Sequence, residues 1–230
     1  MGEHGLLLER INTGRVKRKW VEWRTIKNAK PLEHICMDIK YVYIHGARRN
    51  AYLLAIMDVA TRYVLGWSLR WNMKHTDVIL CLHGALQGYP TQSITLRTDN
   101  GSQFIAHGLK KYLDSCGITQ EFTHIATPEE NAYAESLFSC VEREVIQAYY
   151  FEGIFHAKDV FDRYFKYHNI KRKRHALGRK CPLKYWNTKF GKYHIKPPSG
   201  PVHKPEPKNE LLLNQNVLTS LQKSVQTIGG

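Results

Sequence analysis

The chain has 230 residues, 43% of them hydrophobic, which is enough for one main domain of ordinary size with extensions. Lysine and arginine number 34 against 20 for aspartate and glutamate, so the formal net charge of +14 favours a polyanionic partner, nucleic acid before an anionic membrane. No apolar run approaches the roughly 20 residues of a membrane-spanning helix, and the first residues lack a signal peptide, which predicts a soluble, intracellular protein.

Cysteine and histidine usage gives little support for a structural metal site. The five cysteines are widely separated, odd in number and without a C-x-x-C pair, which favours reduced thiols over a disulfide framework or a zinc ribbon. Among the twelve histidines, close pairs such as His168 and His175 lack a second ligand cluster at zinc-finger spacing. A histidine metal site is therefore not expected.

The N-terminal part of the sequence changes character near residue 31. Residues 1–30 are polar and basic with Trp20 and Trp23 interleaved, which predicts an arm or linker. Three apolar, β-branched runs then follow at 34–45, 51–60 and 63–71, joined by short turns. They predict an antiparallel meander.

Helices and strands are then expected to alternate. In chain order, the patterns predict a helix from Thr76 to about Leu86, a strand at 93–99, a helix at 102–115, a strand at 117–125, a long helix opened by Thr127 to Glu130, and a helix at 156–168. In the long helix one apolar stripe is formed by Ala134, Phe138, Val141, Val145 and Ala148. Proline at its first turn and acids near its positive end favour the helix start there. This layer order is α/β, and a ribonuclease-H-like mixed sheet flanked by helices is one of several that fit.

The C-terminal part is proline-rich from about residue 191, which predicts an extended linker followed by a short amphipathic segment. We therefore expect a basic N-terminal arm at 1–30, a main domain with a basic extension at 31–190, and a flexible tail at 191–230.

Three carboxylates could converge in this fold. Asp38 lies within the first strand between apolar neighbours, and Asp99 lies at the end of the later strand, so the two face one spot if those strands are neighbours. Glu135 lies at the edge of the apolar stripe and shares a helix face with Asn131. Converging carboxylates repel one another unless divalent cations neutralise them, and oxygen ligands suit Mg²⁺ or Mn²⁺. Taken singly, each has a simpler explanation: a turn at Asp99, a salt-bridge partner at Asp38, a solvated helix residue at Glu135.

Four ordered motifs resemble the integrase core of insertion-sequence transposases, especially those encoded by a second reading frame, and of retroviral integrases. They are HICMDIKY around Asp38, TDNGSQF around Asp99, NAYAESLF around Glu135, and YHNIKRKRHALGRKCPLKY, and 35 residues separate Asp99 from Glu135. The similarity spans about 31–186. Two positions depart from the family: Glu130 stands where Asp is frequent, and Glu142 stands where many members have a lysine that contacts DNA.

The resemblance implies a catalytic triad of Asp38, Asp99 and Glu135 that holds two Mg²⁺ or Mn²⁺ ions, Asp38 bridging both. It implies DNA cleavage at element ends and attack of the freed 3′-hydroxyl on another phosphodiester, without a covalent enzyme intermediate. The family's N-terminal helix-turn-helix region is absent from these residues, so a truncated chain or a separately encoded partner is expected. The implied partners are element-end and target DNA and further copies of the chain, in the bacterial cytoplasm near the nucleoid.

A basic segment follows the last predicted helix. From Arg163 to Lys204 there are thirteen lysines and arginines and no acid, which favours phosphate contact and a strong salt dependence of binding. The residues expected to contact DNA are Asn131, Lys171, Arg172, Lys173, Arg174, His175, Arg179 and Lys180. Tyr185 and Trp186 are expected to anchor the segment to the core instead.

Two other functions share these features. A nuclease of the same fold would use the same acids and cut without joining, so joined products distinguish it from a transposase. A protein that only binds DNA would keep its affinity without the three carboxylates and would show no metal-dependent cleavage.

Overall fold

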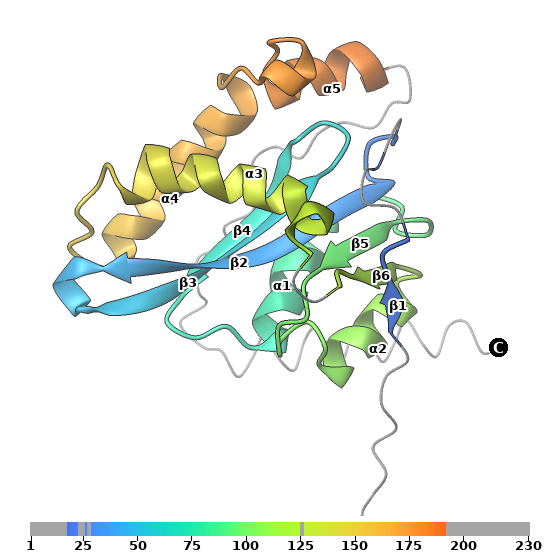
Figure 1. The fold of residues 1–230 in the computed structure, drawn as a ribbon, viewed down its shortest axis with the longest axis horizontal. Coiled ribbons are helices and arrows are strands. Elements are labelled where there is room, and N and C mark those ends of the chain that lie inside the picture. Colours follow the sequence, from blue (N-terminus) through green and yellow to red (C-terminus); the bar gives the residue numbers. More distant parts are fainter. Residues whose placement is uncertain (1–17, 23–25, 27–28, 125–126, 192–230) are drawn as a thin grey trace, which may run out of the picture.

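The computed structural model describes residues 18–22, 26, 29–124 and 127–191 (Figure 1). The strands are β1 (Lys19–Trp20), β2 (His34–Ile44), β3 (Arg49–Asp58), β4 (Val64–Arg70), β5 (Thr95–Thr98) and β6 (Thr119–Phe122). The helices are α1 (His75–Leu86), α2 (His107–Ser115), α3 (Ala132–Val141), α4 (Ile154–Ile170) and α5 (Pro182–Phe190). A 3-10 turn at Pro128–Asn131 precedes α3, and a π-helical turn at Glu142–Ile146 follows it.

The strands form one mixed sheet in the order β1-β6-β5-β2-β3-β4. The first four strands of that order are parallel to one another, whereas β2, β3 and β4 are antiparallel neighbours. The antiparallel meander is thus confirmed, and so is the alternation of helix and strand after it. The meander supplies the long central strand β2, and the short parallel strands supply the sheet edge where their carboxyl ends meet.

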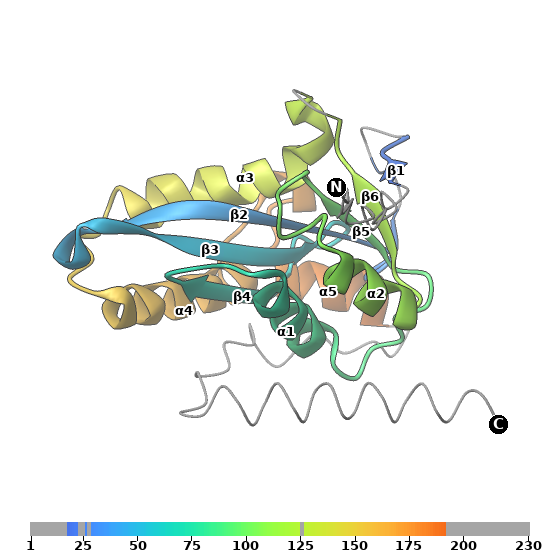
Figure 2. The same cartoon turned by 90° about the horizontal axis from the view of Figure 1, so that it is seen from below.

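Side chains of β2 divide between two hydrophobic cores because successive residues of a strand point to opposite faces. Cys36 and Val42 face the core that contains residues of α3 and α4. Ile35 and Met37 face the core that contains residues of α1 and α2, together with the fully buried Trp186 of α5. Figure 2 shows α1 and α2 on the side of the sheet away from α3. The prediction that Trp186 anchors the basic extension is confirmed.

Several predicted helix features were wrong. The long helix, expected to open at Thr127 to Glu130, begins at Ala132 after the 3-10 turn. The helix expected at 102–115 begins at His107, because the Phe104 N–H donates to the Gly101 carbonyl at 2.9 Å in a turn that buries the Phe104 ring. The stripe of the long helix ends at Val145, since the π-helical turn changes the periodicity and leaves Ala148 exposed. The last helix, α5, was not predicted.

The predicted arm and tail lie partly outside the described residues. Within the arm, Lys19–Trp20 pairs with β6 and thus extends the sheet by a strand. Residues 1–17 and 192–230 are not described, so the expectations for them stay predictions. Within the described residues, no helix combines the length and the apolar character needed to span a bilayer.

Two buried polar side chains join the end of α4 to the first residue of β4 and to the loop before it. The Asn169 side-chain amide donates to the Val64 carbonyl and accepts from the Val64 N–H, both at 2.9 Å. The His168 Nε2 lies 3.1 Å from the Arg62 carbonyl, so this nitrogen carries the proton of a neutral ring. The buried Nδ1 of His168 has no hydrogen-bond partner.

A low pH should reduce the stability of the fold because of His168. Burial, with the nearby cations Arg174 and Arg172, lowers the pKa of His168 from 6.5 to about 3. Its contribution to stability is therefore complete above pH 6.5 and is lost as the pH falls from 6.5 toward 3, by about 1.4 kcal/mol per pH unit. Urea unfolding should show this loss, on the order of 2 kcal/mol between pH 6.5 and 5. His168→Gln, which cannot take up the proton, should lose less over the same range; parallel losses in both proteins would contradict the assignment.

Candidate active site

Asp38 and Asp99 lie at matching positions of neighbouring parallel strands. The register of β2 with β5 pairs His34 with Thr95 and Cys36 with Arg97, and the same offset of 61 residues places Asp38 opposite Asp99, one residue beyond the end of β5. In a parallel pair, residues at matching positions point to the same face. For Asp38 this is the face of Cys36, which packs toward α3. The sequence placed the two acids at one spot on the condition that their strands are neighbours, and this condition is met.

The turn after β5 fixes the Asp99 side chain and closes on β6. The Gly101 N–H donates to Asp99 Oδ1 at 2.9 Å, and the Asn100 side chain donates to the Thr123 carbonyl at 2.7 Å. A Cβ at position 101 would lie 3.1 Å from Asp99 Oδ1, so glycine leaves room for the carboxylate. Asp-Asn-Gly is therefore a turn, as its composition indicates, and this turn also orients an acid beside β2.

The start of α3 brings a third element to the same place. In Figures 1 and 2, α3 runs alongside β2. Asn131, the last residue of the 3-10 turn, donates from its side-chain amide to Asp38 Oδ2 at 3.0 Å. Its own Oδ1 is buried without a hydrogen-bond partner. One turn along α3, Glu135 is exposed on the helix surface.

Electrostatics link the three acids. The pKa of Asp38 rises to about 6, mainly because the carboxylate is buried, and the negative charges of Asp99 and Glu135 add to the rise. Hydrogen bonds from the Ile39 N–H, at 2.7 Å, and from Asn131 oppose it. No Lys, Arg or His among the described residues forms an ion pair with Asp38. Asp38 is thus a half-buried acid, and the negative charges of two further carboxylates oppose its ionisation.

The acids are near one another without being closed around a common point. Among the described residues, no group of three His, Cys, Asp or Glu side chains is gathered tightly enough to hold a metal ion in this arrangement. Glu135 is the exposed member and projects from a helix, so it is the side chain with freedom to rotate toward the other two.

Glu130, which departs from the family pattern, has a structural role that the sequence did not reveal. It is 5% exposed, and its Oε2 accepts from the His124 N–H at 2.7 Å while its Oε1 lies 3.0 Å from His124 Nδ1. Its carbonyl accepts from the buried Arg97 at 3.0 Å. Glu130 therefore joins the end of β6 to the start of α3 and helps to set the position of Asn131.

Glu142, the second departure, forms an ion pair with Lys40 at 3.0 Å. Lys40 lies two residues after Asp38 and thus points to the same face of β2. This ion pair joins β2 to the π-helical turn that follows α3.

The basic extension divides into exposed and engaged residues. Lys171, Lys173, His175 and Arg179 are exposed, and Lys180 is half-buried. Arg172 instead binds both carboxylate oxygens of Glu144, with the Nε to Oε2 distance at 2.8 Å, and Arg174 is buried with its NH1 3.5 Å from the Ser136 hydroxyl. The guanidinium of Arg174 is buried, and its Nε and NH2 have no hydrogen-bond partner.

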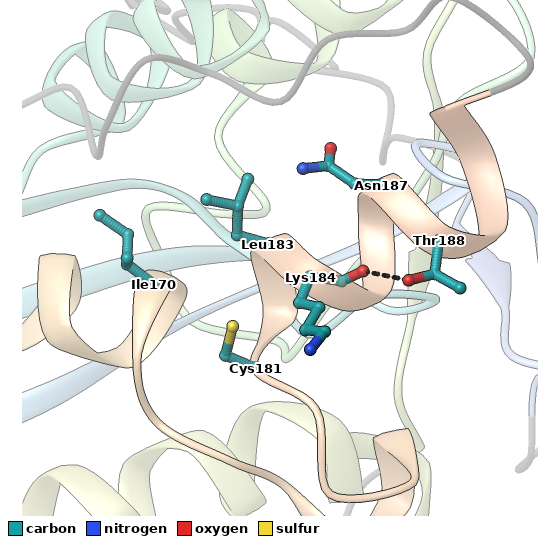
Figure 3. A pocket seen from close by; sticks show the side chains of 6 residues that line it. All are labelled: Ile170, Cys181, Leu183, Lys184, Asn187 and Thr188. Carbon is teal, nitrogen blue, oxygen red and sulfur yellow. Dashed lines mark hydrogen bonds between the residues drawn. The ribbon is translucent and has the colours of Figure 1, made fainter.

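One pocket, of about 450 Å³, lies between the end of α4 and α5 and is shown in Figure 3. Its lining residues are Ile170, Cys181, Leu183, Lys184, Asn187 and Thr188. None of its lining residues carries a carboxylate, and the Thr188 hydroxyl donates to the Lys184 carbonyl at 2.7 Å. The pocket is thus separate from the acids and lacks their chemistry.

Comparison with known proteins shows a similarity to integrase cores and transposases. Two family models, each described as integrase core domain, match residues 28–128 and 116–182, which together span more than half of the chain. The transposase for insertion sequence element IS904 of Lactococcus lactis is 29% identical over 142 residues, which are 61% of this chain and 56% of that protein. The chain spans about half the length of the curated relatives it matches.

Solved structures share the fold. A chain of the simian T-cell lymphotropic virus intasome, in complex with the PP2A regulatory subunit B56 gamma, matches 84% of this chain and 62% of its own length, with a TM-score of 0.55 and 16% identity. The catalytic core domain of BIV integrase matches 69% of this chain and 97% of its own length, with a TM-score of 0.50 and 16% identity. The mixed sheet and its flanking helices are therefore ribonuclease-H-like, as the sequence predicts.

Proposed function

Because the chain belongs to the integrase core family, we propose that it is the catalytic part of an insertion-sequence transposase, which cleaves DNA at element ends and joins the freed 3′-hydroxyl to another phosphodiester. The observation that supports this most is the register of β2 and β5, which sets Asp38 opposite Asp99 beside the helix that carries Glu135.

The donor set suits divalent cations. The three carboxylates offer oxygen ligands only, which Mg²⁺ and Mn²⁺ prefer, and added positive charge would offset the repulsion that Asp99 and Glu135 exert on Asp38. The buried, unpaired Oδ1 of Asn131 is a further oxygen at the same place. We propose that Asp38, Asp99 and Glu135 hold two ions, which would supply an activated hydroxyl nucleophile and a counter-charge for the leaving oxygen.

The protein's own part is to orient these oxygens. Asn131 holds one oxygen of Asp38 and the Ile39 N–H holds the other, while the Gly101 N–H holds Asp99. Neither a serine nor a tyrosine nucleophile is required, because the attacking hydroxyl comes from water or from a DNA 3′ end. The exposed residues Lys171, Lys173, His175, Arg179 and Lys180 are proposed to bind DNA phosphates, whereas Arg172 would act there only after leaving Glu144.

A branched DNA that mimics a strand-transfer product tests this function, because it demands little recognition of element ends. The purified chain with Mg²⁺ or Mn²⁺ should reverse the joining and release a linear, resealed strand together with a free end. Cleavage without a resealed strand would point to a nuclease of the same fold. DNA binding with no metal-dependent reaction would point to a protein that only binds DNA or that requires a second chain.

We further propose that the chain works as an oligomer on paired DNA ends and that a separately encoded helix-turn-helix protein can supply end recognition. Light scattering with and without two copies of the branched DNA tests the first part. A complex that holds a single protein chain per DNA pair would contradict it.

Loss of the Asn131 amide should slow the reaction without unfolding the protein. In Asn131→Leu, which keeps a similar volume, Asp38 loses the donor that orients one of its oxygens. A hydrogen bond to a charged group contributes about 1.5–3 kcal/mol, so the rate on branched DNA should fall by roughly 10- to 100-fold. Asn187→Leu, on α5 beside the separate pocket, is the matched control and should retain the wild-type rate. Equal rates for wild type and Asn131→Leu would show that Asn131 takes no part in the reaction.

A further inference from the structure

Residues 18–22 are docked on the sheet edge beside the candidate site. β1 pairs with β6 in parallel, and the Val21 N–H donates to the Phe122 carbonyl at 3.0 Å. The Trp20 ring stacks on His124 with centroids 5.1 Å apart and planes inclined by 18°. In Figures 1 and 2, β1 lies next to β6 at the end of the sheet. The backbone pairing and the ring stacking hold this segment on β6, and they thus fix the position from which the Arg18 side chain extends.

A second contact ties the same part of the chain to α3. The Tyr133 hydroxyl both donates to the Ile26 carbonyl and accepts from the Ile26 N–H, at 3.2 Å each. Tyr133 is two residues before Glu135, and its ring also packs under the Arg62 guanidinium at 4.2 Å. The described residues before the core thus contact β6 at one point and the first turn of α3 at another.

Arg18 reaches the turn that carries Asp99. Its NH1 donates to Asn100 Oδ1 at 3.1 Å, and its guanidinium carbon lies 5.6 Å from the centre of the Phe122 ring. The Asn100 side chain is held in this orientation, because its amide nitrogen donates to the Thr123 carbonyl. Arg18 is exposed, and the structure gives it no carboxylate partner among the described residues.

The Arg18 guanidinium is better matched to a phosphate than to either of the groups it contacts, the Asn100 side chain and the Phe122 ring. Arginine presents five N–H donors in a fixed fork, and only one of them is engaged by Asn100. The remaining donors can form a paired contact with a phosphate, which is among the stronger charge-assisted arrangements. The adjacent cation, Lys19, differs in this respect, since its ammonium lies 4.0 Å from the Glu121 carboxylate.

We propose that Arg18 is a phosphate-binding residue of this site, which holds the DNA backbone flanking the reacting phosphodiester, and that the β1–β6 pairing exists to present it there. The inference rests on the proposed function for the identity of the DNA, although it concerns binding alone. The ligand is the phosphodiester backbone, so the contact carries no base preference.

Binding measurements in a Glu135→Gln background test the proposal without any reaction. Fluorescence anisotropy with the branched DNA is recorded over a series of KCl concentrations. Arg18→Ala should weaken binding by about tenfold and reduce the slope of log affinity against log salt by about one, the value for one lost phosphate contact. Arg18→Lys should keep the slope and recover part of the affinity, because it retains the charge and loses the fork. Lys19→Ala should stay within about twofold of the parent, since Glu121 already engages that charge.

Three results would overturn the proposal: an unchanged slope in Arg18→Ala, an equal loss in Lys19→Ala, or full retention of affinity in both. Slow hydrogen exchange at the Val21 amide in Arg18→Ala would show that the strand is still docked, so that a lost slope reports the contact itself. If the wild-type chain fails to react with branched DNA while Arg18→Ala still loses one unit of slope, the proposed reaction fails and the phosphate contact stands. If the wild type reacts and Arg18→Ala binds normally, only the phosphate contact fails.

Discussion

Asp99→Asn should abolish the metal-dependent reaction on branched DNA and leave the fold intact. The substitution keeps the side-chain oxygen that accepts from the Gly101 N–H, so the turn after β5 is preserved, while the negative charge beside Asp38 is lost. Residues that act as one catalytic unit are strongly non-additive, so a single loss should cost about 10³-fold or more in rate. Gel analysis of single-turnover reactions with Mg²⁺ measures this directly.

The control for Asp99→Asn is Asp114→Asn, at the end of α2, where the carboxylate pairs with Lys110 on the surface. It removes the same charge by the same change and should leave the rate within about twofold, since an exposed pair contributes little. Comparable losses in the two variants would attribute the effect to net charge and not to the site.

Stability offers an independent check on the acids. Asp38 is costly to ionise where it is, since burial and two like charges raise its pKa. Asp38→Asn should therefore be inactive yet as stable as the wild type or more stable, the pattern expected where a charge is retained for function at the expense of the fold.

The second large effect is expected for DNA affinity. Simultaneous replacement of Lys171, Lys173, Arg179 and Lys180 by alanine removes four cations that the structure leaves at or near the surface. If each contacts a phosphate, the salt slope should fall by about four, and affinity at 0.1 M salt should fall on the order of 10³-fold. Anisotropy titrations over a KCl series measure both quantities.

A double variant on α4 is the matched control for this experiment. Arg163 and Lys166 are exposed cations that pair with Asp159 at 2.8 Å and Asp162 at 2.6 Å on the same helix. Their replacement by alanine should change the slope by less than one. A quadruple variant that behaves like this control would mean that DNA follows another surface.

Much of the fold could be predicted because its patterns are local. The three apolar, β-branched runs joined by short turns in 34–71 mark the meander, and the proline at 128 with acids beside it marks the 3-10 turn that leads into the long helix. The neighbourhood of β2 and β5 could be expected only conditionally, since strand order depends on long-range packing that no single run encodes. The family resemblance, carried by four ordered motifs, supplied what periodicity could not.

Other features depended on contacts that the sequence does not display. From the sequence, Glu130 is interpreted as an acid at the start of a helix. In the structure its carboxylate accepts a hydrogen bond from His124, which follows β6. In the basic extension, the composition gives no reason to distinguish Arg172 and Arg174 from their neighbours. In the structure, however, Arg172 is bound by Glu144 of the π-helical turn, and Arg174 is buried beside Ser136. The pairing of Lys19–Trp20 with β6 was missed because two residues are too short to give a strand pattern.

The most direct test of the proposed site is the position of Mn²⁺ in crystals of the protein soaked with that ion and measured at its absorption edge. The anomalous signal should peak within coordination distance of both Asp38 and Asp99, with Glu135 rotated toward it, and should vanish in crystals of Asp99→Asn. A peak elsewhere on the chain, or one that persists in Asp99→Asn, would contradict the assignment of these three acids as the metal-binding centre.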